Sequence, residues 1–143
     1  MQASVEVRDA VARFYERLSA GDVEGTAATI CGDESVFVIG TQRIGGGRAE
    51  WLESVRENAR FGVVFEAGDI RAWADGGMGW AVDEPAIVLP DGLRVRTRMT
   101  AVLRREDDGV FRLLHQHYSL AVPDEVGVGS AAAWREELGL APA

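Results

Sequence analysis

The sequence lacks the features that mark secreted, membrane-spanning and nucleic-acid-binding proteins. It has one cysteine, Cys31, which excludes an internal disulfide and fits a reducing compartment, so we expect a cytoplasmic protein. No apolar run could span a bilayer, and no basic region followed by an apolar core opens the chain, so we expect no membrane span and no signal peptide. Basic residues number 15 against 23 acidic ones, and the net charge of −8 argues against nucleic acid or anionic membranes as partners.

The composition that remains is that of a globular domain. Hydrophobic residues make up 47% of the chain, too many for a disordered protein. A chain of 143 residues fits one domain, and burying about 68–70% of its unfolded surface gives it a core without disulfides. We therefore predict a single domain over residues 1–143, with a C-terminal tail helix over about 130–138.

The longest alternation of apolar and polar residues covers 93–122 and predicts a long β-hairpin with one buried face. Apolar residues of its first arm, among them Met99, fall on the inner face, and arginines fall on the other. Residues 106–109 form a four-residue turn. Pairing Arg105 with Val110 places these residues of the second arm inside: Leu114, Gln116, Tyr118 and Leu120. A slip of one residue would exchange the faces.

A second hairpin precedes the first. Residues 78–89 return through Asp91-Gly92, and Asp-Gly is a strong signal for a two-residue turn. This turn places Glu84 opposite Met99. The inner face then carries Trp80, Val82, Glu84, Ala86 and Val88. It is apolar apart from one carboxylate.

Helices precede these strands. Helical periodicity and capping residues predict helices over 4–20, 23–30 and 48–60, and short strands over 35–39 and 63–74. Helices first and antiparallel strands last predict an α+β fold. A curved sheet of this kind can form a half-barrel with a cavity between the sheet and the helices.

Residues 92–125, GLRVRTRMTAVLRREDDGVFRLLHQHYSLAVPDE, resemble the closing hairpin of SnoaL-like proteins in the nuclear transport factor 2-like superfamily. The pattern R-x-T-x-V-L-R, an acidic-glycine turn, an aromatic residue and L-x-H-x-H-x-S carries the resemblance, which covers a core of about 5–125. It implies a cone-shaped half-barrel of a curved, mixed, mostly antiparallel sheet wrapped on N-terminal helices. It also implies a homodimer through the sheet.

The chain resembles, more distantly, the association domain of calcium/calmodulin-dependent kinase II. The pocket of that domain carries arginines on these strands, and the matching positions here are Glu84, Ala101 and Tyr118. This sequence departs from that pattern at all three positions, so we expect a pocket without those arginines.

Glu84 is the sharpest candidate for chemistry. A carboxylate among apolar side chains is desolvated, which raises its pKa and suits it to general acid–base catalysis. Glu84 would be the base and Tyr118 the donor. The alternative is a structural ion pair between Glu84 and Arg43 or Arg48. We expect the ligand to contact these residues: Trp80, Met99, Gln116, Trp51, Leu114 and Phe14.

His115 and His117 share one face of a strand, which suggests a metal site. A zinc site needs three or four ligands, and Asp83 is the one further candidate. We favour histidines bonded to Thr100, to Asp83 or to a dimer mate, and we expect no metal and no cofactor.

These residues together predict a small-molecule pocket protein of the SnoaL-like class. Its ligand would be apolar, with one polar group near Glu84 and Tyr118, and any catalysis would be cofactor-free proton transfer of the isomerase, cyclase or dehydratase type. The alternative is a non-catalytic, dimerising accessory or ligand-sensing domain. The absence of a complete Asp/Tyr/Asp or His/Asp constellation in the predicted pocket favours that alternative.

Overall fold

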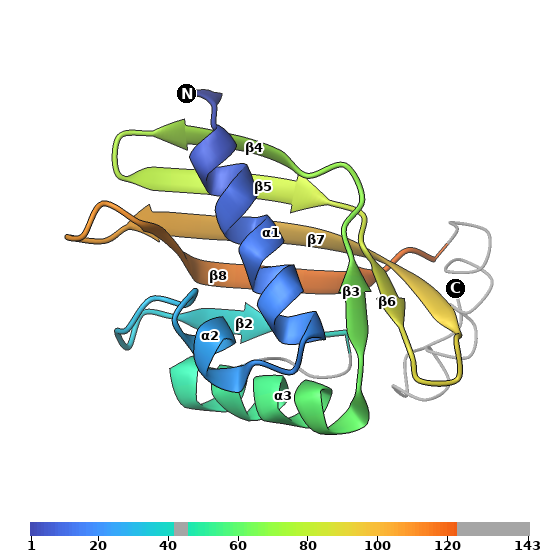
Figure 1. Cartoon of the computed structure of the whole chain (residues 1–143). Coiled ribbons are helices and arrows are strands. Elements are labelled where there is room, and N and C mark those ends of the chain that lie inside the picture. Colours follow the sequence, from blue (N-terminus) through green and yellow to red (C-terminus); the bar gives the residue numbers. More distant parts are fainter. Residues whose placement is uncertain (42–45, 123–143) are drawn as a thin grey trace, which may run out of the picture.

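The computed structural model describes residues 1–41 and 46–122, and the predicted tail helix over 130–138 lies outside them. Three helices occur in this part of the chain (Figure 1): α1 (Val5–Ser19), α2 (Val23–Ala27) and α3 (Arg48–Phe61). The strands are β1 (Gln2–Ala3), β2 (Phe37–Ile39), β3 (Val64–Glu66), β4 (Arg71–Asp75), β5 (Met78–Asp83), β6 (Ala86–Val88), β7 (Arg94–Arg105) and β8 (Phe111–Leu120). None of these helices has the length and apolar character needed to cross a bilayer.

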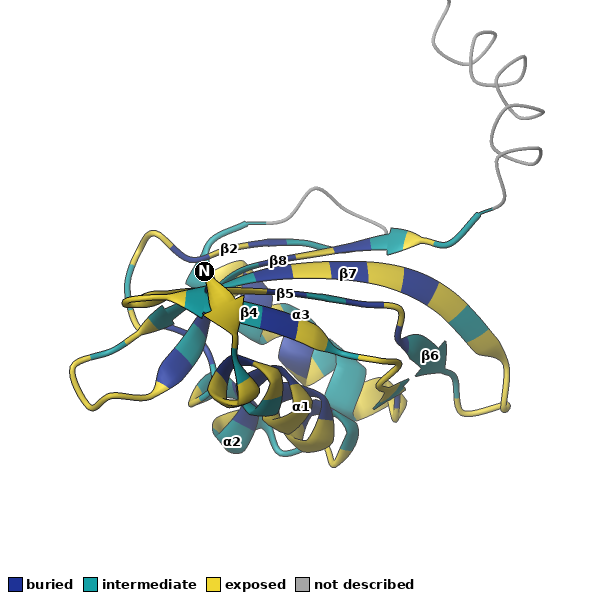
Figure 2. Cartoon of the chain, turned by 90° about the horizontal axis from the view of Figure 1, so that it is seen from above, coloured by how far each residue is buried: buried dark blue, intermediate teal, exposed yellow. Residues whose placement is uncertain are grey.

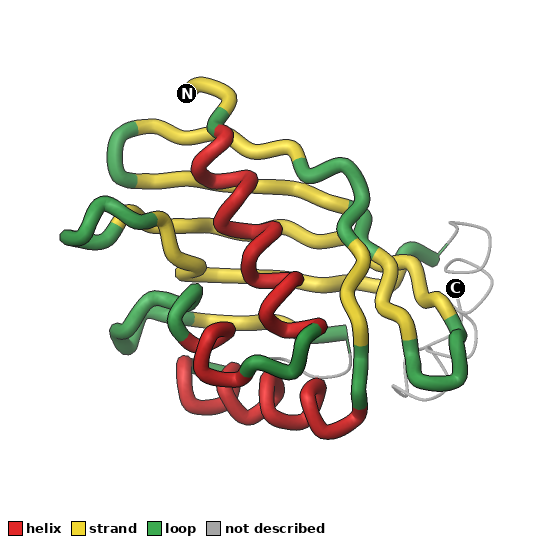
Figure 3. The backbone as a smooth tube through the Cα atoms, in the orientation of Figure 1, coloured by secondary structure: helices red, strands yellow, loops and turns green. Residues whose placement is uncertain are grey.

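The strands form one curved, open sheet, and the helices lie on one side of it (Figures 2 and 3). The long strand β7 is central: β5 and β6 pair in turn along one of its edges, and β8 pairs along the other, all antiparallel. Strand β2 adds in parallel to β8, β4 and β1 extend the sheet beyond β5, and β3 pairs with β6. The predicted α+β fold with a curved, mostly antiparallel sheet is confirmed.

Helix α1 crosses the inner face of the sheet and forms the middle of the core (Figure 1). It begins at Ser4, whose hydroxyl accepts a hydrogen bond of 3.2 Å from the amide of Val7. Apolar residues at spacings of three and four make its buried stripe: Val7, Ala10, Val11, Phe14, Tyr15 and Leu18. Gly79 lets α1 lie directly on β5, because a Cβ there would be 2.5 Å from a methyl group of Val7.

The β7–β8 hairpin differs from the predicted pairing by two successive shifts. Arg105 pairs with Phe111, one position beyond the predicted partner, and this exchanges the faces near the turn. A bulge opposite residues 102–103 then shifts the pairing by one more residue and restores the predicted faces. Between the two shifts Leu113 is fully buried, whereas Leu114 is half-buried. Leu114 packs against the core at the bulge without being fully buried, and Leu113 takes the fully buried position.

Strand β5 presents the face opposite to the predicted one. The turn between β6 and β7 has three residues, 90–92, enclosed by a backbone hydrogen bond of 2.9 Å between Leu89 and Leu93. Its last residue is a glycine with φ of 86°, as a three-residue hairpin turn requires. The additional residue shifts the register by one and exchanges the faces. Asp83 therefore occupies the inner position predicted for Glu84.

Candidate functional site

A cavity of about 290 Å³ lies between α1, α3 and the inner face of the sheet. Its walls combine aromatic and aliphatic side chains with polar ones, as small-molecule sites do; the polar side chains besides Tyr118 are Thr41, Glu50, Ser54, Asn58 and Gln116. Among the lining residues in the described part of the chain, Glu50 alone is charged. The lining from the helices and the sheet includes Phe14, Trp51, Val55, Phe65, Gln116 and Tyr118.

The structure brings together four of the eight predicted site residues. Those that line the cavity are Phe14, Trp51, Gln116 and Tyr118. Met99 is fully buried in the core beside the cavity, and neither Met99 nor Leu114 is part of its wall. Trp80 is 37% exposed and stacks on Trp73 with ring centroids 4.5 Å apart. The predicted inner position of Trp80 is wrong for the same reason as that of Glu84, the one-residue shift of β5.

Glu84 lies on the outer face of the sheet. Its side chain is 62% exposed, and its carboxylate accepts a hydrogen bond of 3.2 Å from Arg96. An exposed pair of this kind contributes little stability. Of the two partners expected for a structural ion pair, Arg48 donates instead to the backbone oxygen of Cys31 at 3.0 Å, and Arg43 lies outside the described residues. Glu84 therefore lacks the burial and the position that chemistry in the cavity requires.

Gln116 places an amide group on the cavity wall. Strand β8 holds it between β2 and β7, opposite Val38 and Ala101, and 0% of the residue is exposed. Neither its amide nitrogen nor its amide oxygen has a hydrogen-bond partner within the described residues. Buried polar groups are nearly always paired, so this amide has a donor and an acceptor available to a bound group.

A second polar cluster adjoins the cavity through Tyr118. It also contains Tyr15 from α1 and Asp83 from β5, which is 5% exposed and whose Oδ2 accepts a hydrogen bond of 3.2 Å from the amide of Gly68. The other carboxylate oxygen and both phenol oxygens are buried without a well-formed hydrogen bond in the described part of the chain.

Burial shifts all three pKa values in this cluster upward. Desolvation raises the pKa of Asp83, and the amide of Gly68 partly opposes this. Desolvation also raises the pKa values of Tyr15 and Tyr118 well above the usual value of a phenol, and the nearby carboxylate adds to both shifts. Both phenols therefore stay protonated and able to donate, and Asp83 holds a proton more tightly than an exposed aspartate does.

Phe65 connects this cluster to the cavity wall. Its ring stacks on Tyr15 with centroids 6.1 Å apart and meets Tyr118 edge-on at 5.7 Å. Sequence reasoning missed Tyr15 and Phe65 as site residues, and it considered Asp83 only as a partner of the histidines. Tyr15 follows Val11 by four residues on the stripe of α1, so its burial could have been found. Asp83 required the correct turn length.

The histidines lie away from the cavity. Nδ1 of His115 is 2.9 Å from the backbone oxygen of Phe37 on β2, and His117 is exposed opposite Thr100. No three His, Cys, Asp or Glu side chains gather into a possible metal site within residues 1–41 and 46–122. Cys31 is buried, and desolvation raises the pKa of its thiol to about 11, so it is not a reactive thiolate.

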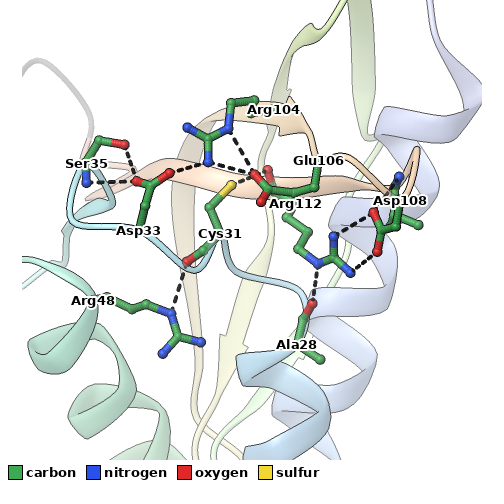
Figure 4. A network of polar contacts seen from close by, with 10 residues as sticks. Ala28, Cys31, Asp33, Ser35, Arg48, Arg104, Glu106, Asp108 and Arg112 are labelled. Atoms are coloured by element: carbon green, nitrogen blue, oxygen red, sulfur yellow. Dashed lines mark hydrogen bonds and ion pairs between the residues drawn. The ribbon is translucent and has the colours of Figure 1, made fainter.

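Charged residues join the turn end of the β7–β8 hairpin to the segment after α2 (Figure 4). Arg104 binds Asp33, and Arg112 binds Asp108 through two hydrogen bonds of 2.6 and 2.9 Å. Hydrogen bonds from Ser35 and Arg104 lower the pKa of Asp33 to about 2. Arg112 likewise lowers the pKa of Asp108 to about 2. This network is structural, because it contributes no residue to the cavity lining.

A curved open sheet with helices on one side defines the fold class, an α+β protein with a cavity between the two layers. The family of the SnoaL-like domain matches residues 7–123, so the chain belongs to this family. The resemblance predicted from the closing hairpin is thereby confirmed. A search of the curated proteins gives no match.

Solved structures share the fold at low sequence identity. A candidate dehydratase of the NTF2-like family from Streptomyces avermitilis is 21% identical, with a TM-score of 0.75 over 82% of this chain and 95% of that one. A candidate ketosteroid isomerase from Shewanella frigidimarina is 14% identical, with a TM-score of 0.66 over 78% and 92%. A candidate calcium/calmodulin-dependent protein kinase type II association domain from Thiobacillus denitrificans is 19% identical, with a TM-score of 0.65 over 79% and 93%. At these identities the likeness establishes the fold alone.

Proposed function

We propose that this chain binds an apolar small molecule in the cavity and acts on it by cofactor-free proton transfer. The observation that carries the proposal is a cavity wall in which aromatic and aliphatic side chains surround two buried residues with unpaired polar atoms, Gln116 and Tyr118. A few convergent polar groups on such a wall fix the orientation of a ligand. Two proteins with this fold are named as a candidate dehydratase and a candidate ketosteroid isomerase, which supports this type of chemistry.

In this proposal the cluster beside the cavity replaces Glu84 as the acid–base element. The amide nitrogen of Gln116 donates a hydrogen bond to the oxygen of the ligand on which negative charge develops, so the single proton of Tyr118 is available for transfer. A proton that leaves the ligand moves to the hydroxyl of Tyr118, which passes its own proton to Tyr15, and Tyr15 passes its proton to Asp83. The raised pKa of Asp83 makes its carboxylate a stronger proton acceptor than that of an exposed aspartate.

The test is deuterium exchange from D2O at the carbon beside the carbonyl of apolar ketones, followed by NMR. We expect the wild-type protein to accelerate exchange and Asp83→Asn and Tyr118→Phe to lose about 100-fold or more of that rate. Glu84→Gln is the matched control, since it removes a neighbouring carboxylate from the outer face, and it keeps the wild-type rate. Equal exchange rates for Asp83→Asn and the wild type would contradict the mechanism.

A ligand-sensing domain without catalysis is the second candidate. Asp83 reaches the cavity only through the two tyrosines and does not line it, which favours binding over turnover. In either case we propose a homodimer through the outer face of the sheet, where the stacked Trp73 and Trp80 are accessible. Light scattering is expected to give a particle of about twice 15.5 kDa, and Trp80→Asp to give the monomer mass.

A further inference from the structure

The amide of Gln116 sets a narrower requirement on the ligand than the cavity as a whole does. A primary amide carries two donors on its nitrogen and an acceptor on its oxygen, and both atoms are unpaired here within the described residues. Exchanging the two atoms by rotating the amide leaves the same pair of groups on the cavity wall. The matching ligand group therefore offers an acceptor and a donor side by side.

The charge of the cavity wall restricts the ligand further. Among the described lining residues there is no lysine, arginine or histidine, and Glu50 is negative. Against this described part of the wall, a carboxylate or phosphate beside Gln116 would be buried without an opposite charge, which is strongly unfavourable. It would also offer acceptors only and leave the amide oxygen of Gln116 unpaired. The described lining therefore favours a neutral group at Gln116.

The aromatic walls describe the remainder of the ligand. Phe14 meets Trp51 edge-on with centroids 6.1 Å apart, and Phe65 meets Tyr118 edge-on at 5.7 Å. These four rings line the same cavity as Gln116. Flat apolar rings pack well against such walls.

We propose that the ligand is a flat, apolar molecule whose polar head is a neutral amide-type group, a lactam or a primary amide, paired with the side chain of Gln116. The proposal rests on ligand binding in the cavity as proposed above and names the class of ligand. A simple ketone accepts but does not donate, so it would satisfy only one end of the Gln116 amide. The lactam forms both hydrogen bonds at once.

Calorimetry with three matched probes tests the proposal: phenanthridinone, its N-methyl derivative and fluorenone. The first is a flat lactam, the second lacks the N–H donor, and the third is a ketone. We expect the wild-type protein to bind phenanthridinone at least about tenfold more tightly than either of the others, as one additional hydrogen bond predicts. Gln116→Met keeps the length and apolar packing of the side chain, and it is expected to bind all three compounds with similar affinity.

Three results would distinguish a failure of the amide-type head from a failure of ligand binding in the cavity. Equal wild-type affinities for phenanthridinone and its N-methyl derivative would refute the amide-type head. Tight binding of fluorenone alone would refute the amide-type class of ligand. If Val55→Phe, which fills the cavity, weakened that binding and the surface variant Val64→Phe did not, the result would still support ligand binding in the cavity. Binding of none of the three compounds to folded wild-type protein would count against both proposals.

Discussion

Replacing Gln116 by methionine is expected to stabilise the protein. Methionine has nearly the volume and length of glutamine, so it fills the same space without a new cavity. Gln116 is 0% exposed and its amide has no partner in the described part of the chain, so the folded protein bears the desolvation of that amide uncompensated. An unpaired buried polar group costs about 1–3 kcal/mol, and this is the expected gain in the free energy of unfolding. For a domain of this size the melting temperature would rise by roughly 3–10 °C.

Thr97 provides the matched control on the neighbouring strand. It is also fully buried, but its hydroxyl donates a hydrogen bond of 2.9 Å to the backbone oxygen of Pro85. Thr97→Val removes a paired polar group and is expected to lower the free energy of unfolding by about 0.5–1.5 kcal/mol. Urea denaturation of both variants and the wild type measures the two changes in the free energy of unfolding, provided that this free energy falls with urea concentration at the same slope in all three proteins. If Gln116→Met destabilised the protein as much as Thr97→Val, the amide of Gln116 would be paired and the reasoning would be refuted.

Three further predictions follow from the register and the charges. Leu113→Ala is expected to lower the free energy of unfolding, measured by urea denaturation, by about 2–5 kcal/mol, because Leu113 is fully buried. Leu114→Ala is expected to lower it by less than half of that. The reverse order would place the bulge elsewhere. Asp83→Asn is expected not to lower the melting temperature at neutral pH. The folded protein raises the pKa of Asp83, so ionisation of this carboxyl group opposes folding, and asparagine does not ionise. A clear loss of stability in Asp83→Asn would contradict the direction of this pKa shift. Asp33 and Asp108 have lowered pKa values, so their contribution to stability is present above the unfolded pKa of about 4 and is lost as the pH falls through about 2. Melting curves of Asp33→Asn and the wild type should accordingly differ at pH 7 and converge near pH 2, and a constant difference would count against the network.

The sequence predicted the architecture because its signals are local and repeated. Alternation over 93–122, the cap at Ser4 and the apolar stripe of α1 each determine one element, and together they determined an α+β fold with helices on one face of a curved sheet. The inner positions of Gln116 and Tyr118 followed from the same alternation. Two unrecognised shifts cancelled along β8, so these two positions were correct although the predicted pairing was not.

The site was predicted less well because it depends on single residues in turns. Reading Asp91-Gly92 as a two-residue turn, rather than a turn over 90–92, exchanged the faces of β5. This one error placed Glu84 and Trp80 inside and left Asp83 outside. A period of two cannot correct such an error, because Val82 and Ala81 are both apolar and either face is acceptable to the pattern. The cluster of Asp83 with the tyrosines joins distant segments and has no local signal.

The most direct test of the proposed pocket follows the side-chain amide of Gln116 by 15N–1H NMR during titration with phenanthridinone. Gln116→Met identifies its pair of signals by their disappearance. The account predicts that these signals shift and that their hydrogens exchange more slowly with solvent as the ligand binds, while the other glutamine side chains keep their positions. Saturable binding that leaves the Gln116 signals unchanged would contradict it, because the ligand would then occupy another part of the molecule.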